Sequence, residues 1–223
     1  FAMEYIDYLY NNNFINHREK EYLKDLSARK IISICTKIIK ENDITLPDHR
    51  EILNLDKGHN SEKYEIYRNL YSCNAIYVTT NYDNYLDEIA RQEKNKDYNN
   101  QGIYYKDENL LSSNLKNGNV LHLHGSVKDK KNMVISIEDY MKKYVRESEM
   151  EELLRKIFEA YTVLFVGYGL EEYEILEFII NKSDKENNKL KHYLLQPIFK
   201  EDIKLYHLLS KYYMRMGIKL IPY

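Results

Sequence analysis

Residue types that can do chemistry follow three short, apolar, β-rich runs of this sequence. They are Asn81, Asp83, His122, His124 and the Gly-x-Gly sequence at 167–169. An imidazole can accept a proton, an amide can orient a hydroxyl or a water, and glycine lets a backbone approach a ligand closely. The sequence therefore predicts a site for acid–base chemistry at the ends of these runs.

The two histidines lie two residues apart, so both side chains project from the same face of an extended strand. His124 stands beside Gly125, where a side chain can reach a ligand. His122 is one pleat deeper, and we expect it to be buried and hydrogen-bonded. The alternative is a metal site, because a His-x-His pair with Asp83 as a third ligand has the residue types that bind transition metals. We expect no metal, and the spacing by itself leaves the alternative open.

The glycine sequence at 167–169 has two interpretations. A Gly-x-Gly after a strand begins the fingerprint of a dinucleotide-binding loop, but Glu172 stands where the third glycine belongs. The simpler interpretation is a tight turn between a strand and a helix. The sequence contains no Walker loop, no Ser-His-Asp signature and no His-Glu-x-x-His zinc motif.

Helical periodicity dominates the first 70 residues and then alternates with β-rich runs. We expect helices at Tyr5–Tyr10, Glu21–Lys40, Glu62–Tyr71, Tyr82–Gln92, Glu138–Ala160 (with a break near Arg146–Ser148), Glu172–Ile180 and Lys200–Met216. We expect strands at Asn74–Thr80, Gly102–Tyr105, Asn119–His124, Met133–Ile137, Thr162–Val166, His192–Leu195 and Ile218–Ile221, the last of them at the edge of the sheet.

Strands that alternate with helices predict βαβ units and a mostly parallel sheet. The fold class we predict is α/β, a Rossmann-like, doubly wound sheet with a helical N-terminal lobe. Residues 1–72 form the mainly helical segment in this prediction, packed on a core of residues 73–223. Ligands of such sheets bind beyond the carboxyl ends of the strands, which is where the polar residues named above stand.

Composition excludes several classes of function. The 223 residues include 33 Lys and Arg against 35 Asp and Glu, a formal net charge of −2, so we expect no direct nucleic-acid binding. The longest apolar run, Tyr161–Val166, is too short to span a membrane. Cys35 and Cys73 are too few for a disulfide scaffold or a zinc ribbon and fit a reducing cytoplasm. Because Phe1 opens the sequence, we expect its natural start to lie upstream.

Four motifs in order resemble the sirtuin-like family, in a divergent bacterial branch linked to anti-phage defence. They are Thr79-Thr80-Asn81-Tyr82-Asp83, Leu121-His122-Leu123-His124-Gly125-Ser126, Leu164-Phe165-Val166-Gly167-Tyr168-Gly169-Leu170 with Glu171-Glu172, and a closing run that ends at Tyr223. The resemblance extends from Ile76 to Tyr223.

The chain departs from the family pattern in three ways. The family's Gly-Ala-Gly loop, which cradles the NAD pyrophosphate, is absent from these 223 residues. Gly169 replaces the usual serine, which removes one hydroxyl near the adenosine half. The zinc-binding cysteines of protein-deacylating sirtuins are also missing, which argues against that branch.

The resemblance implies that NAD+ is the substrate and that the bond between nicotinamide and ribose is cleaved. It implies His124 as the general base toward a ribose hydroxyl or water, and Asn81 as the group that orients the ribose or the attacking water. It implies that Asp83 either holds the nicotinamide pocket or supports the developing cation. The ligand-binding residues that it implies are Thr80, Gly125, Ser126, Gly167, Tyr168 and Gly169.

By the same resemblance we expect a cytoplasmic NAD+ hydrolase that depletes NAD+ in bacterial anti-phage defence. Such an enzyme needs control, so we expect a homo-oligomer or a partner protein of the defence system. Three alternatives stay open at this point. They are a non-catalytic sirtuin-like module that binds a partner or a nucleotide, an NAD-dependent protein deacylase, and a metal hydrolase that uses His122 and His124.

Overall fold

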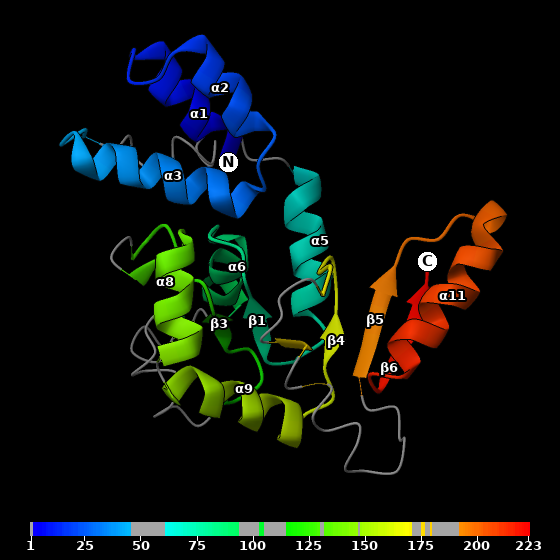
Figure 1. Ribbon diagram of the computed structural model, residues 1–223. Helices are drawn as coiled ribbons and strands as arrows, with labels where there is room; N and C mark the ends of the chain where they lie inside the picture. Colours follow the sequence, from blue (N-terminus) through cyan, green and yellow to red (C-terminus); the bar gives the residue numbers. More distant parts are fainter. Residues whose placement is uncertain are drawn as a thin grey trace. The chain divides into compact units, whose positions relative to one another are not determined.

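The computed structural model describes residues 2–45, 61–93, 103–104, 115–129, 132–146, 148–170, 175–176, 179 and 192–223. The chain forms two compact units, Phe1–Arg146 and Glu147–Tyr223. Each unit combines helices with parallel strands, which confirms an α/β protein (Figure 1). The doubly wound arrangement and the division into 1–72 and 73–223 stay predictions. Within the described ranges, no helix has both the length and the apolar character to cross a membrane.

Three helices open the first unit: α1 (Ala2–Asn11), α2 (His17–Lys24) and α3 (Ala28–Glu41). The prediction of one helix over Glu21–Lys40 is wrong, because α2 ends before Asp25 and a new helix starts after Ser27. The Ser27 backbone is extended, with φ −64° and ψ 148°. Two helices therefore share an apolar periodicity that we interpreted as one.

Helix α2 begins earlier than its apolar residues indicate, at a reciprocal capping box. The Asn16 side chain accepts a hydrogen bond from the Glu19 N–H at 3.0 Å, and the Glu19 carboxylate accepts one from the Asn16 N–H at 2.7 Å. This exchange satisfies two N–H groups that the start of a helix otherwise leaves without partners.

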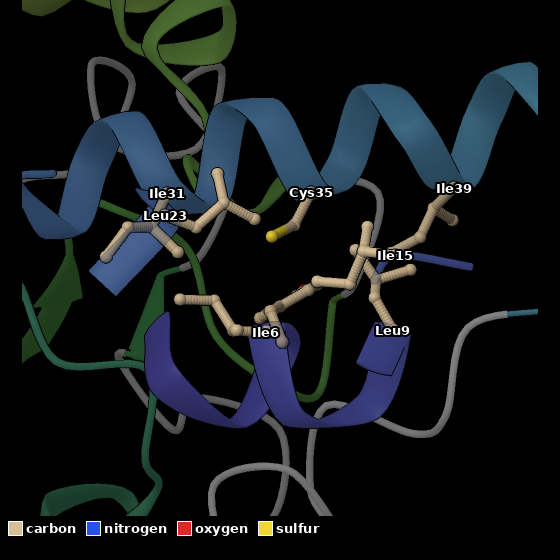
Figure 2. Close-up of a cluster of buried hydrophobic side chains, with 8 residues drawn as sticks. Ile6, Leu9, Ile15, Leu23, Ile31, Cys35 and Ile39 are labelled. Atoms are coloured by element: carbon tan, nitrogen blue, oxygen red, sulfur yellow. The ribbon is translucent and has the colours of Figure 1, made fainter. Parts of the chain in front are cut away.

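The three helices enclose a hydrophobic cluster, shown in Figure 2. Its buried members are Tyr5, Ile6, Leu9, Ile15, Leu23, Ile31, Cys35 and Ile39. In Figure 2 the Cys35 thiol of α3 points into the cluster. Burial raises the pKa of this thiol to about 11, so Cys35 is a neutral core group at pH 7.

The sheet of the first unit has the strand order β1-β3-β2 and is parallel throughout. Its strands are β1 (Tyr77–Thr79), β2 (Ile103–Tyr104) and β3 (Val120–His122), and helices α5 (Ser61–Tyr71) and α6 (Tyr85–Glu93) precede and follow β1 in the chain. Strand β3 is central and fully buried, and its His122 pairs in register with Thr79 of β1. The carboxyl ends of β1 and β3 therefore lie side by side.

The strand predicted at Met133–Ile137 is wrong. Ile137 is the first residue of helix α8 (Ile137–Met141), which a π-helical turn at Lys142–Arg146 continues. The Ser136 side chain accepts from the Asp139 N–H at 3.1 Å, and the Asp139 carboxylate accepts from the Ser136 N–H at 3.0 Å. This capping box starts a helix inside a run of β-favouring residues, so local hydrogen bonding overrides the propensity of the apolar side chains.

The second unit contains a parallel sheet in the order β4-β5-β6. Its elements are α9 (Ser148–Ala160), β4 (Leu164–Phe165), β5 (His192–Gln196), α11 (Ile203–Met214), which a short 3-10 turn at Lys200–Asp202 precedes, and β6 (Ile218–Pro222). Strand β6 lies at an edge of this sheet, as predicted. The start of α9 at Ser148 confirms the predicted break in the helix. Most of the predicted helix Glu172–Ile180 lies outside the described residues.

Replacing Leu9 by alanine is expected to lower the free energy of unfolding by about 2–5 kcal/mol, because the buried side chain leaves a cavity. Urea unfolding followed by circular dichroism measures the loss. Tyr22→Ala is the control, because that side chain is exposed and its removal is expected to cost less than about 0.5 kcal/mol. Equal losses in the two variants would contradict a core formed by α1, α2 and α3.

Candidate functional site

Two loops meet at the carboxyl ends of β1 and β3. The loop after β1 contains Asn81 and Asp83, and the chain after β3 contains His124. Backbone hydrogen bonds join them: the Leu123 N–H donates to the Thr79 carbonyl at 2.9 Å, and the Val127 N–H donates to the Tyr82 carbonyl at 3.0 Å. The three residues predicted to act in catalysis are thus held on adjoining loops of one unit.

His124 is only 8% exposed and lies among tyrosine rings. Its ring centroid is 5.8 Å from that of Tyr144, 6.2 Å from that of Tyr140 and 6.4 Å from that of Tyr82. The first two rings meet the imidazole edge-on, at interplanar angles of 87° and 71°. The tyrosines fix the position of the ring and exclude water from most of it.

The pKa of His124 is lowered to about 4. Burial is the main cause, because it disfavours the charged imidazolium, and the positive charges of Lys143 and Arg29 act in the same direction. A hydrogen bond with the Thr80 backbone acts in the opposite direction. His124 is therefore neutral at pH 7 and able to accept a proton, although it is a weaker base than an ordinary histidine.

The two cations reach His124 from different elements. Lys143 comes from the π-helical turn after α8 and is itself only 6% exposed. Arg29 comes from α3 of the helical segment, and its guanidinium carbon lies 4.5 Å from the centroid of the Tyr140 ring. In the same region, the Ile137 N–H at the start of α8 donates to the Ser33 hydroxyl at 2.8 Å. The helical segment thus contributes charge to the surroundings of His124.

His122 is buried and hydrogen-bonded, as the sequence predicts. Its Nε2 lies 2.7 Å from Oδ1 of the buried Asp87 in α6, and its Nδ1 lies 3.3 Å from the Asn81 carbonyl oxygen. These contacts engage both ring nitrogens within the fold. Across the part of the chain that the structure describes, no three or more His, Cys, Asp or Glu side chains gather as they would around a metal ion.

Sequence analysis missed Asp87 as a functional candidate. The signal was present, because an acidic residue stands three positions before Ala90 on the helix face that α6 buries. A buried carboxylate needs a polar partner, and His122 of β3 is that partner.

Asn81 and Asp83 both interact with Tyr67 of α5, a residue that sequence analysis also missed. The pKa of Tyr67 is raised to about 12, mainly by burial and then by the negative charge of Asp83, while a hydrogen bond with the Asn81 side chain opposes the rise. Asp83 also accepts a hydrogen bond from the Tyr85 N–H at 3.2 Å, where α6 starts. Asn81 is exposed and Asp83 is half-buried, so both lie nearer to solvent than His124.

Gly125 and Ser126 have clear structural roles. Gly125 has φ +75°, and a Cβ there would lie 2.5 Å from the Asn132 carbonyl oxygen, so glycine is required by the close approach of the chain's own backbone. Ser126 is fully buried, and its hydroxyl donates to the Tyr82 carbonyl at 3.4 Å. The predicted contacts of both residues with a ligand stay predictions.

Gly167, Tyr168 and Gly169 follow β4 in the second unit. Gly167 has φ +62° and open space where a Cβ would be, unlike Gly125. The Tyr168 ring stacks on that of Phe165 with centroids 5.9 Å apart. Leu170 also has a positive φ, 53°, so the chain turns sharply after β4, as a tight turn requires.

The fold and the arrangement of these residues can be compared with known families. The SIR2-like domain matches residues 75–221, which is more than half of the chain. The chain belongs to the SIR2-like family. The match includes Asn81, His124 and Gly167, and it extends over both compact units. No curated protein matches the chain.

Membership of the SIR2-like family confirms the predicted resemblance to sirtuin-like proteins. SIR2-like domains are typically NAD-dependent enzymes that use NAD+. The narrower predictions, which concern the anti-phage branch, the cleavage reaction and the role of each residue, go beyond what the family match states.

Gly125→Ala is expected to be more destabilising than Gly167→Ala in this SIR2-like chain. Both glycines have a positive φ, which costs an alanine about 1–2 kcal/mol, but only at Gly125 would the new methyl group clash with backbone atoms. We expect Gly125→Ala to lose at least about 1 kcal/mol more in urea unfolding. Equal losses would show that the chain beside Gly125 can move away without cost.

Proposed function

We propose that this SIR2-like chain is an NAD+ hydrolase that cleaves the bond between nicotinamide and ribose. The observation that carries the proposal is His124, a histidine kept neutral at pH 7 and held beside the loop of Asn81 and Asp83. An imidazole base, an exposed amide and a half-buried carboxylate are the groups that hydrolysis of a glycosidic bond to a cationic leaving group needs.

The proposed reaction consumes one water for each NAD+. The bond from the ribose C1′ to the nicotinamide nitrogen breaks, its electron pair leaves with nicotinamide, and the water oxygen bonds to C1′. His124 accepts the proton that the water loses. The products are ADP-ribose, nicotinamide and one proton, which His124 later releases to solvent.

A weak base is sufficient for this reaction. The sugar becomes a strongly electrophilic oxocarbenium ion in the transition state, so the water loses its proton only as the new bond forms. A histidine that is neutral until it accepts this proton also places no positive charge beside the cation while the bond to nicotinamide breaks. Asn81 orients the ribose or the water, and the negative charge of Asp83 supports the cation.

The remaining predicted residues belong to the binding of NAD+ in this proposal. Thr80, Gly125 and Ser126 shape the strand ends around His124, and the resemblance assigns Gly167, Tyr168 and Gly169 to the adenosine half of NAD+. By resemblance of the four motifs, the protein depletes NAD+ in bacterial anti-phage defence. Assembly of a homo-oligomer or binding of a defence-system partner controls it in this proposal.

One observation favours a second candidate, a non-catalytic sirtuin-like module. A buried histidine with three tyrosine neighbours and a pKa of about 4 also resembles a structural core histidine. Turnover separates the two candidates, because a module that only binds a nucleotide or a partner releases no nicotinamide.

His124→Ala is expected to lower NAD+ turnover at least about 100-fold, because positioned acid–base catalysis contributes roughly 10²–10⁴-fold. Nicotinamide release measures it, on this chain and on a version that includes any residues upstream of Phe1. Asn81→Ala is expected to lose activity too, and His17→Ala, which removes an exposed histidine of α2, is the control. Wild-type turnover in His124→Ala would remove His124 from the mechanism.

The pH dependence of turnover follows from the lowered pKa of His124. A protonated His124 cannot accept a proton, so kcat/KM is expected to fall only as the pH drops toward about 4, well below the usual 6.5 for histidine. Between about pH 5 and about pH 7.5, kcat/KM is expected to be independent of pH. An acidic limb with its midpoint near 6.5 would show that the base titrates as an exposed histidine does.

A further inference from the structure

The buried carboxylate of Asp87 has no part in the mechanism proposed above. Its side chain is 0% exposed, and its Oδ1 lies 2.7 Å from Nε2 of His122, whose side chain is 1% exposed. A carboxylate buried this completely is unfavourable unless a partner compensates for the lost water. The pair is therefore an interaction inside the fold rather than a surface contact.

His122 connects Asp87 to the loop that contains Asn81. One ring nitrogen faces the Asp87 carboxylate, and the other lies 3.3 Å from the Asn81 carbonyl oxygen. Both partners are acceptors, so the ring can donate to both only when each nitrogen bears a proton. In that state the bond to Asp87 is charge-assisted and shorter and stronger than a neutral one.

Asn81 is held by further bonds besides the one to His122. Its N–H donates to the Thr79 hydroxyl at 3.0 Å, and the next residue, Tyr82, accepts from the Val127 N–H at 3.0 Å. The His122 side chain reaches this loop from the central strand. His122 is also two residues before His124, so the end of β3 contacts the loop of Asn81 and leads directly into the turn that holds the base.

Arg91 lies one helical turn beyond Asp87 in α6. Its Nη2 is 4.0 Å from the Asp87 Oδ2, so the second carboxylate oxygen faces a cation as well. The carboxylate is thus engaged on both oxygens, which limits its rotation. Helix α6 is thus joined to β3 through Asp87 and His122.

We propose that Asp87 is a positioning residue: acting through His122, it fixes the backbone of Asn81 relative to His124. The inference rests on the proposed NAD+ hydrolysis for its effect on rate. The fixing of the loop is a separate property that does not require turnover to be measured.

The test replaces Asp87 by asparagine, which keeps the volume and removes the charge. We expect kcat for nicotinamide release to fall about 100-fold with little change in KM, because a small displacement of a reacting group costs rate rather than binding. We also expect the backbone amides of Asn81 and Val127 to exchange with solvent faster, while those of α3 keep their rates.

Ile89→Val is the matched control, because Ile89 is also buried in α6 and its apolar side chain can form no hydrogen bond or ion pair with His122. It is expected to leave kcat and the exchange rates of the loop unchanged. If Asp87→Asn behaves like Ile89→Val, with wild-type kcat and unchanged exchange at Asn81 and Val127, the proposal is overturned.

Two further outcomes keep the inference testable. If Asp87→Asn does not fold, nitrogen-15 NMR of the unaltered chain decides. Hydrogen bonds from His122 to both Asp87 and the Asn81 carbonyl predict slowly exchanging protons on both ring nitrogens of His122. A proton on only one ring nitrogen overturns the proposal. If the unaltered chain releases no nicotinamide, the proposed function fails, and the exchange rates of Asn81 and Val127 in Asp87→Asn still decide whether Asp87 fixes the loop.

Discussion

The parallel pairing of β1 with β3 is the constraint on which the candidate site depends. Because Thr79 pairs with His122, the loop of Asn81 and the residue His124 emerge at the same edge of the sheet. Backbone bonds from Leu123 and Val127 then join the two loops directly. A shift of this register by one residue would send every side chain of the strand to the opposite face and separate the amide from the imidazole.

The surroundings of His124 show how a fold sets the chemistry of a side chain. Tyrosine rings exclude water, and cations from two other elements of the same unit disfavour the imidazolium. One of these cations is Arg29 of α3, so the helical segment is part of the site's electrostatics as well as a hydrophobic cluster of its own. A change in the packing of α3 against α8 would therefore alter the pKa of His124.

Sequence analysis succeeded where a pattern depends on neighbours in the chain. Helix α5, strands β1 and β3, and the polar residues at the strand ends followed from apolar runs and from the residues that stop them. It failed at Glu21–Lys40 and Met133–Ile137, where Ser27 separates two helices and a capping box of Ser136 and Asp139 begins a helix. At Met133–Ile137 the hydrogen bonds of two polar side chains decided the backbone against a longer apolar pattern, whereas at Ser27 the backbone is extended without a side-chain bond that caps α3.

The sequence by itself determined the family, the parallel α/β class, and the candidates Asn81, Asp83 and His124, because these depend on motifs and on local periodicity. Only the tertiary structure decided the partner of His122, the place of Tyr67 beside Asn81 and Asp83, and the low pKa of His124. Those properties arise from side chains that are distant in sequence: Asp87 lies 35 residues before His122, and Arg29 reaches His124 from a separate helix. Burial and charge act through space, and the order of residues along a chain does not specify which of them will meet.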